Sequence, residues 1–261
     1  MFDIGAMTDA IKRLAAAMKG AQRDKREPRR KAKENLQLEI ERAILRHFNA
    51  QKRAILERLQ SAKAVQPDFS DLFEDWDGEI ERNLIRLFLR GAYDGIGLVG
   101  EDIEFYTDYT EANARALEWA RKYAGNLIKD IDKTSLDIVK NAVSTFIDTP
   151  GFTLGDLANL LPFGEARAFT IAVTETTRAY SQGQQIARDE IMNRWPDVKV
   201  VGTWYTNVDD LVCELCGPLE GTEVEGDGEF YDSNDDDNLD GFPPLHPNCR
   251  CWVNWRTKIN E

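Results

Sequence analysis

Apolar side chains recur every three or four residues along most of this chain, which is the spacing of one buried helix face. The longest such stretch runs from Glu34 to Lys63 without a glycine or proline. At 1.5 Å per residue it predicts a rod about 45 Å long. Its apolar face comprises Leu36, Ile40, Ile44, Phe48, Ile55 and Leu59. We expect this face to be buried against other helices or a partner chain. We interpret the adjacent His47 as a helix-face histidine without a chemical role.

More helices are predicted between residues 72 and 193. They span 72–91, 111–131, 135–147 and 165–193, with a short additional helix that starts near Phe152. Thr134 is a candidate N-cap between two of these helices. Thr153 is a candidate N-cap of the short helix, with Asp156 at its N3 position. The glycine-rich stretch after Gly91 contains neither a dinucleotide-binding fingerprint nor a P-loop lysine, so we interpret it as a connector.

The helix predicted over 165–193 has unusually small residues on its inner face. These are Ala168, Ala172, Thr176, Ala179, Gly183 and Ala187. Because small side chains let neighbouring helices approach closely, we expect this helix to be central in a bundle. Glu175 and Arg178, three residues apart on it, are interpreted as a surface ion pair, with a buried network as the alternative.

The pattern changes after Trp195 and Pro196. Residues 198–205 are β-branched and aromatic and predict a strand, and 251–255 predict a returning strand. The sequence therefore predicts a mainly α fold, with a helical domain at 34–195 and a small α+β module with a β-ribbon at 196–261. A module of about 65 residues with few core residues is marginally stable. Structural zinc can contribute about 10–16 kcal/mol to folding, so we expect metal rather than burial to decide whether this module folds.

All four cysteines and one of the two histidines lie in the last fifth of the chain. A C-x-x-C pair is followed, after an acidic loop, by H-x-x-C-x-C, which offers five soft or borderline donors where tetrahedral zinc needs four. The predicted zinc ligands are Cys213, Cys216, His246, Cys249 and Cys251. One donor is left over, and the spacing leaves open which of Cys249 and Cys251 ligates.

Disulfides are the alternative use of these cysteines, but they need an oxidising compartment. The first twenty residues lack the apolar core and cleavage site of a signal peptide, and no run of about 18 apolar residues exists to span a membrane. We therefore expect a reducing cytoplasm, where this spacing favours a metal.

Calcium and catalytic chemistry fit the residues less well than structural zinc. Asp236, Asn238 and Asp240 copy the first half of an EF-hand loop, but the position that needs a bidentate glutamate is Pro247, so we interpret residues 232–240 as a solvated loop. The chain has no H-E-x-x-H, few histidines and a C-x-x-C that precedes its histidine, so we expect no enzymatic activity.

Charge is unevenly distributed along the chain. The net charge of −13 argues against a general nucleic-acid binder, because a polyanion would be repelled over most of the surface. However, the segment from Lys19 to Lys33 is strongly basic, and no lysine or arginine occurs between Lys199 and Arg250. We define residues 1–33 as a basic N-terminal arm, which is either an interaction arm or a solvated, disordered tail.

Three segments of the chain resemble one known family. TWYTNVDDLVCELCGPLEGT at 203–222 and FPPLHPNCRCW at 242–252 resemble the C-terminal signature of the Mu F-like phage head morphogenesis family of minor head proteins. The helical segment 172–183 resembles the family's segment just upstream, except that Val173 stands where the family tends to have arginine. The resemblance implies a minor capsid protein that acts with the portal in head assembly, with DNA packaging or ejection as a further role.

We therefore expect a non-enzymatic virion protein of the phage head, present in the host cytoplasm during assembly. Its expected partners are the portal and other capsid proteins, with packaged DNA contacted through the basic arm, and no membrane. The alternative is a nucleic-acid-binding zinc protein, supported by the arm and by Arg250 between two thiolates. A zinc enzyme is the third reading.

Overall fold

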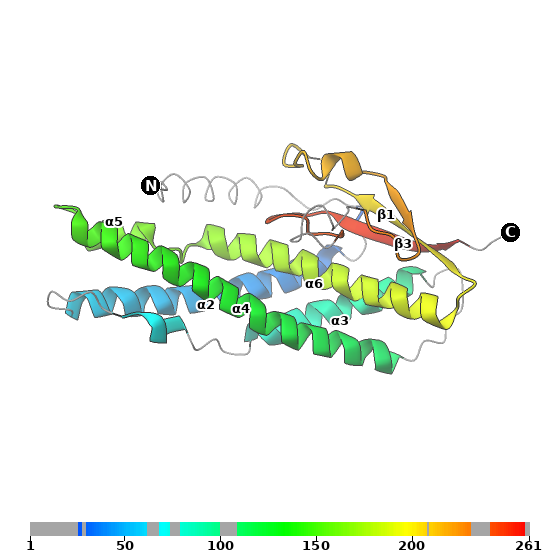
Figure 1. Cartoon of the computed structure of the whole chain (residues 1–261), viewed down its shortest axis with the longest axis horizontal. Helices are drawn as coiled ribbons and strands as arrows, with labels where there is room; N and C mark the ends of the chain where they lie inside the picture. Colours follow the sequence, from blue (N-terminus) through cyan, green and yellow to red (C-terminus); the bar gives the residue numbers. More distant parts are fainter. Residues whose placement is uncertain are drawn as a thin grey trace.

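The computed structural model describes residues 26–27, 30–61, 68–73, 79–99, 109–207, 209–230 and 241–258. Its elements in chain order are α2 (Arg30–Ser61), η1 (Ser70–Phe73), α3 (Glu79–Val99), α4 (Tyr109–Asp148), α5 (Leu154–Leu160), α6 (Glu165–Arg194), β1 (Lys199–Tyr205), η2 (Gly217–Leu219), β2 (Glu223–Glu225) and β3 (Trp252–Lys258). The fold is mainly α with a small sheet near the C-terminal end, as the sequence predicted (Figure 1). The acidic loop 232–240 and residues 1–25 of the basic arm lie outside the described residues.

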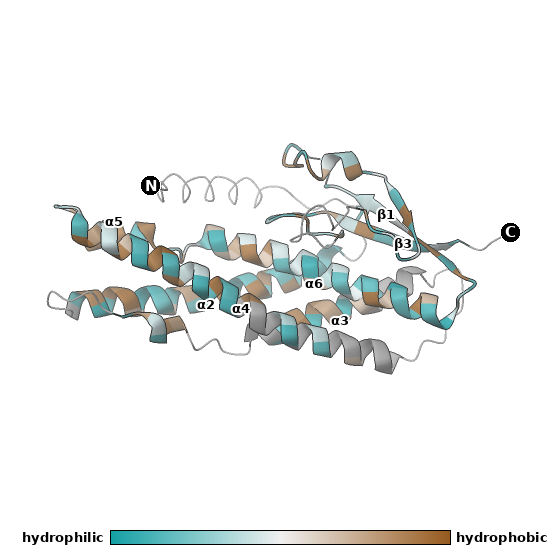
Figure 2. Ribbon diagram, viewed as in Figure 1, coloured by the Kyte–Doolittle hydropathy of each residue, from teal (hydrophilic) through white to brown (hydrophobic). Residues whose placement is uncertain are grey.

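The long helices run alongside one another in an elongated bundle, and α3 and α6 are the helices that contact the sheet (Figure 1). Helices α2 to α6 all contribute to one apolar core. Its fully buried members include Phe48, Ile55, Leu84, Phe88, Val139, Val143, Leu157 and Ala172. Hydrophobic and hydrophilic residues alternate around the described helices, which is the amphipathic pattern a bundle requires (Figure 2). No described helix is long and apolar enough to cross a lipid bilayer.

Helix α4 is continuous, so the prediction of two separate helices at 111–131 and 135–147 was wrong. The Thr134 hydroxyl donates to the backbone carbonyl of Asp130 at 2.8 Å, one turn back in the same helix, instead of capping a new one. The apolar face also continues in phase across this point, because Ile131 and Val139 enter the same core. Without a glycine or proline at the junction, nothing interrupts the helix.

The glycine-rich stretch after Gly91 is also helical as far as Val99, so the predicted connector was wrong over those residues. A Cβ added at Gly91 would lie 2.3 Å from the carbonyl oxygen of Tyr180, and one added at Gly183 would lie 2.3 Å from that of Phe88. The two glycines therefore let the backbones of α3 and α6 approach directly. The central, closely packed helix predicted over 165–193 is confirmed by this contact.

The last residues of the basic arm are built into the fold, because α2 begins at Arg30 instead of Glu34. Lys33 and Glu27 form an ion pair in which both side chains are almost fully buried. The Lys33 ammonium also lies 4.5 Å from the ring centre of Tyr180 on α6. Arg26 reaches the C-terminal module, where it pairs with Glu220 at 3.1 Å. Arg26 and Lys33 thus join the bundle to the module.

The C-terminal module contains an antiparallel sheet in the order β2-β1-β3. The two predicted strands are confirmed, whereas β2 was missed because it is a three-residue strand with two glutamates. The core of the module is larger than the sequence predicted, with Trp204, Trp255 and Phe242 buried beside Ile191 of α6. Arg188 of α6 is buried against the rings of Phe242 and Trp255, at 5.3 and 5.0 Å from their centres.

The contact between α3 and α6 makes Gly183 a sharp test of the packing. We expect Gly183→Ala to lower the free energy of unfolding by about 1–3 kcal/mol, because the added methyl group meets backbone atoms that cannot move aside. The matched control is Gly155→Ala in α5, whose Cβ would meet only the Thr153 hydroxyl at 3.5 Å. That variant should be neutral or up to about 1 kcal/mol more stable. Urea unfolding measures both, and equal effects would contradict the close approach.

Candidate metal centre

The first knuckle follows β1 and contains Cys213 and Cys216. The backbone N–H of Cys216 donates to the sulfur of Cys213 at 3.3 Å, and the N–H of Gly217 donates to the Cys213 carbonyl at 2.9 Å. This tight turn directs both sulfurs to one side. Cys216 is buried, and Cys213 is partly buried.

The second knuckle, from His246 to Cys251, is anchored on α6 by threonine hydroxyls. The backbone N–H of Asn248 donates to the hydroxyl of Thr174 at 2.9 Å. The hydroxyl of Thr177 donates to the Cys249 carbonyl at 3.0 Å. Asn248 has φ of +65°, the left-handed conformation that asparagine tolerates better than most residues. The helix therefore fixes the peptide groups on either side of the bend that presents His246 and Cys249.

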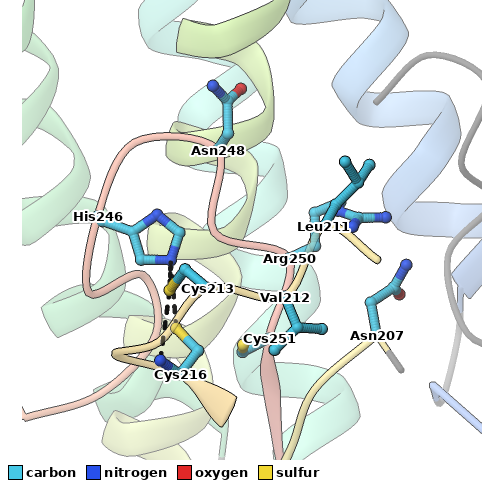
Figure 3. A pocket seen from close by; sticks show the side chains of 9 residues that line it. All are labelled: Asn207, Leu211, Val212, Cys213, Cys216, His246, Asn248, Arg250 and Cys251. Carbon is cyan, nitrogen blue, oxygen red and sulfur yellow. Dashed lines mark hydrogen bonds between the residues drawn. The ribbon is translucent and has the colours of Figure 1, made fainter. Parts of the chain in front are cut away.

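The two knuckles close on each other, as the sequence predicted. The Nε2 atom of His246 lies 3.1 Å from the sulfur of Cys213 and 3.2 Å from that of Cys216 (Figure 3). The sulfur of Cys216 lies 3.9 Å from that of Cys249. A tetrahedral zinc site with bonds of 2.0 to 2.3 Å has donor atoms about 3.3–3.8 Å apart, and these separations lie within about 0.2 Å of that range.

The five donors form two overlapping groups, in each of which all donor atoms lie within 4.8 Å of one another. One group is Cys213, Cys216 and His246, and the other is Cys216, Cys249 and Cys251. Cys216 belongs to both and therefore lies at the centre. All four cysteines are free thiols, and the five side chains lie close enough to hold a metal ion.

The tautomer of His246 suits metal binding. Its Nδ1 atom lies 2.8 Å from the carbonyl oxygen of Pro247, which can only accept a hydrogen bond, so Nδ1 carries the hydrogen. In the neutral ring, Nε2 then carries a lone pair that is directed at the sulfurs. A carbonyl partner at the other ring nitrogen orients metal-binding histidines in the same way. Hydrogen bonding to Cys249 raises the pKa of His246 to about 9, so a metal must displace a proton from this ring at neutral pH.

The thiols differ in how readily they ionise. Hydrogen bonds from Cys216 and Cys251 hold the pKa of Cys249 well below its usual value. The same contact with Cys249 raises the pKa of Cys216. The cluster therefore shares its protons among neighbouring sulfurs, and a cation that takes their place would relieve the crowding of negative charge.

An ion pair between the buried Arg250 and the partly buried Asp209 connects the second knuckle to the segment that precedes the first. The Nη2 atom of Arg250 lies 2.7 Å from Asp209, which also accepts from the side chain of Asn207 at 3.0 Å. Arg250 is 6% exposed and borders the same small pocket as Cys213, Cys216 and His246 (Figure 3). Its guanidinium therefore serves the interior of the module and does not present a charge to solvent.

The prediction of a surface ion pair on α6 was wrong. Glu175 is buried, accepts from the Tyr123 hydroxyl at 2.7 Å and lies 3.7 Å from the Nε atom of Arg178. Burial raises the pKa of its carboxyl group. Glu175 is therefore part of a buried network, which was the alternative prediction. This network links α6 to α4, whereas threonine side chains of α6 bond to the second knuckle.

Comparison with known protein families supports the resemblance seen in the sequence. The sequence model described as phage Mu protein F like protein matches residues 124–254. The chain belongs to this family. The match covers most of α4, then α5, α6, β1, β2, both knuckles and the start of β3, so the family segment is the part that builds the cysteine cluster together with its supporting helix. No curated protein and no solved structure matches the chain.

Sequence reasoning found the five donors of this family segment but missed the residues that position them. Thr174 and Thr177 were visible only as part of the family-like TETTR segment, and Asp209 only as one of many acidic residues. Val173, the departure from the family pattern, is buried beside Phe169, and the partly buried Leu211 packs against this pair. An apolar contact with the first knuckle therefore accompanies the hydroxyl contacts with the second.

The role of Thr177 can be tested by an isosteric substitution. We expect Thr177→Val to lower the free energy of unfolding by about 1–2 kcal/mol, because the buried Cys249 carbonyl loses its donor. Thr170→Val is the matched control, since the Thr170 hydroxyl bonds only within α6, to Ala166 at 3.0 Å. Chemical unfolding followed by tryptophan fluorescence measures both. A Thr177 variant as stable as the control would show that the hydroxyl does not hold the knuckle.

Proposed function

We propose that this protein is a minor head protein that acts with the portal in phage head assembly, and that its C-terminal module is folded around one zinc ion. The observation that carries the proposal is that the family segment brings all its cysteines and His246 into one cluster. Family membership indicates a phage head protein. The portal as partner, a role in DNA packaging or ejection and the host cytoplasm as the site of assembly belong to the proposal.

The zinc ion would be held by Cys213, Cys216, His246 and at least one of Cys249 and Cys251. Thiolate and imidazole donors at tetrahedral spacing suit zinc better than calcium or magnesium, which prefer oxygen. Bound there, zinc would supply a cross-link between two segments 30 residues or more apart in sequence. Thr174 and Thr177 have a structural role, because they hold the second knuckle on α6.

We assign the centre no catalytic role. A hydrolytic zinc site keeps an open position for water and a general base nearby. Here five protein donors compete for four positions, and His246 is oriented toward the sulfurs by Pro247. Since Arg250 is buried against Asp209, it does not supply the exposed nucleic-acid contact on which the zinc-dependent DNA-binding alternative relied.

The metal can be tested on the purified chain. We expect one zinc per chain by elemental analysis, loss of the metal in Cys216→Ser and its retention in His47→Gln, since the second histidine lies on α2 away from the cluster. His246→Gln should lower zinc content or affinity. Comparing Cys249→Ser with Cys251→Ser identifies the remaining ligand. A wild-type chain that contains no zinc, or does not take it up, would contradict the proposal.

Assembly is tested separately in phage-producing cells. A tagged wild-type chain should recover portal and other head proteins, and Cys216→Ser should recover less because its module is no longer cross-linked. His47→Gln is again the control, and its recovery should match the wild type. If the wild-type chain is absent from particles and recovers no head protein, the assembly role is wrong whatever the zinc result.

A further inference from the structure

Arg26 lies in a site that the C-terminal module builds. Its guanidinium lies 5.2 Å from the ring centre of Tyr205 and 5.8 Å from that of Trp252. Nη1 pairs with Glu220 at 3.1 Å, and Nη2 donates to the backbone carbonyl of Thr206 at 3.3 Å. We call Tyr205, Thr206, Glu220 and Trp252 the arginine site. It combines aromatic rings, a carboxylate and a carbonyl, which one planar guanidinium can contact at the same time.

The arginine site is held in shape by contacts within the module. The rings of Tyr205 and Trp252 stack with 5.6 Å between their centres, at the paired ends of β1 and β3. The second carboxylate oxygen of Glu220, Oε2, accepts from the backbone N–H and the hydroxyl of Thr206, while Oε1 faces Arg26. The ring stack and the bonds from Thr206 do not involve Arg26. We therefore expect the site to keep its geometry when the Arg26 side chain leaves it.

Two adjacent residues of the chain, Arg26 and Glu27, are held very differently. The ion pair between Glu27 and Lys33 has both side chains 1% exposed, so it cannot open without disturbing the bundle. In the pair between Arg26 and Glu220, the side chains are 46% and 33% exposed. Exposed ion pairs and exposed cation–π contacts are each weak. The contact of Arg26 with the module can therefore open and close while α2 stays in place.

The surroundings of the arginine site favour a basic segment. No lysine or arginine occurs between Lys199 and Arg250. The exposed acidic residues of this stretch that the structure describes on either side of the site include Glu214, Glu220, Glu223, Glu225, Asp227 and Glu229. Arg256 and Lys258 of β3 pair with two of them. Because the stretch has no lysine or arginine of its own, it attracts a segment of opposite charge.

The arginine site and its present occupant lie in different parts of the chain. Tyr205, Thr206, Glu220 and Trp252 are all inside the family segment 124–254, whereas Arg26 lies before it. Tyrosine, tryptophan and arginine are also the residues that most often dominate the binding energy of protein interfaces. Both observations favour a surface that binds an arginine of another protein over one that only holds the N-terminal arm.

We infer that the arginine site binds the side chain of an arginine on a partner protein, and that Arg26 occupies it until that arginine takes its place. The incoming guanidinium would contact the same two rings and pair with Glu220, so the exchange replaces one set of contacts by an equivalent one. Lysine fits less well, because its ammonium lacks the planar fork of donors. The identity of the partner as a phage head protein rests on the proposed function, whereas the recognition of arginine does not.

Arginine recognition is tested on the full chain with a blocked peptide of residues 24–28, Asp-Lys-Arg-Glu-Pro, whose one arginine corresponds to Arg26. Binding is followed by NMR through the indole N–H of Trp252. Arg26→Gln opens the site. Arg256→Gln is the matched control, because it removes another half-exposed arginine of the module, which pairs with Glu223 at 2.7 Å. Thermal unfolding confirms that each variant is folded.

We expect the Arg26→Gln chain to bind the peptide about fivefold more tightly than the wild type or the Arg256→Gln chain, in both of which Arg26 competes. Replacing the arginine of the peptide by lysine should weaken binding to the opened chain by about threefold to fivefold, and so should adding Glu220→Gln. Binding of neither peptide by the opened chain, or equal binding of both, would overturn the inference.

The exchange with a partner is tested by recovery of head proteins from phage-producing cells. Arg26→Gln should recover at least as much as the wild type, and Glu220→Gln should recover less. Glu223→Gln is the matched control and should equal the wild type, since Glu223 lies on the same sheet outside the arginine site. Equal recovery by the two glutamate variants would overturn the exchange. If the wild type recovers no head protein while the peptide binds as expected, arginine recognition is retained and the assembly role is rejected.

Discussion

The structure depends on two contacts of helix α6. One is with α3, and the other is with the second knuckle. Gly183 lets its backbone meet α3 without an intervening side chain. From the same helix, Thr174 and Thr177 bond to the peptide groups around Cys249. A residue that moved α6 away from α3 would therefore also displace the surface on which the second knuckle rests. The bundle and the cysteine cluster share one rigid element, and neither is positioned independently of it.

The apolar periodicity predicted the helices well, because apolar residues that repeat every three or four positions fit one face of a helix and few other structures. It failed where a helix continues through residues that usually end one. Thr134 can either cap a helix or bond back to its own, and only the packing of Ile131 and Val139 in one core decides between them. Gly91 has the same ambiguity, since a glycine that breaks a helix and one that admits a neighbour are identical in sequence.

The candidate site could be predicted further than its surroundings. Cysteine and histidine spacing is restrictive, so five donors were identified from their order alone. The residues that support them are threonines and an aspartate, which occur throughout the chain without such roles. Their function follows from long-range contacts, for example 72 residues between Thr177 and Cys249. The burial of the module's tryptophans could not be predicted from the module alone. They pack partly against α6, which lies in another part of the sequence.

The contacts of Arg26 and Lys33 have a mechanical consequence. Arg26 is attached to the module, and four residues after it the chain enters α2 and buries Lys33 against α6. Arg26 and Lys33 are thus fixed at the boundary where the bundle and the module meet. A force applied at Arg26 would therefore act on the contact between the bundle and the module before it reached the interior of either part.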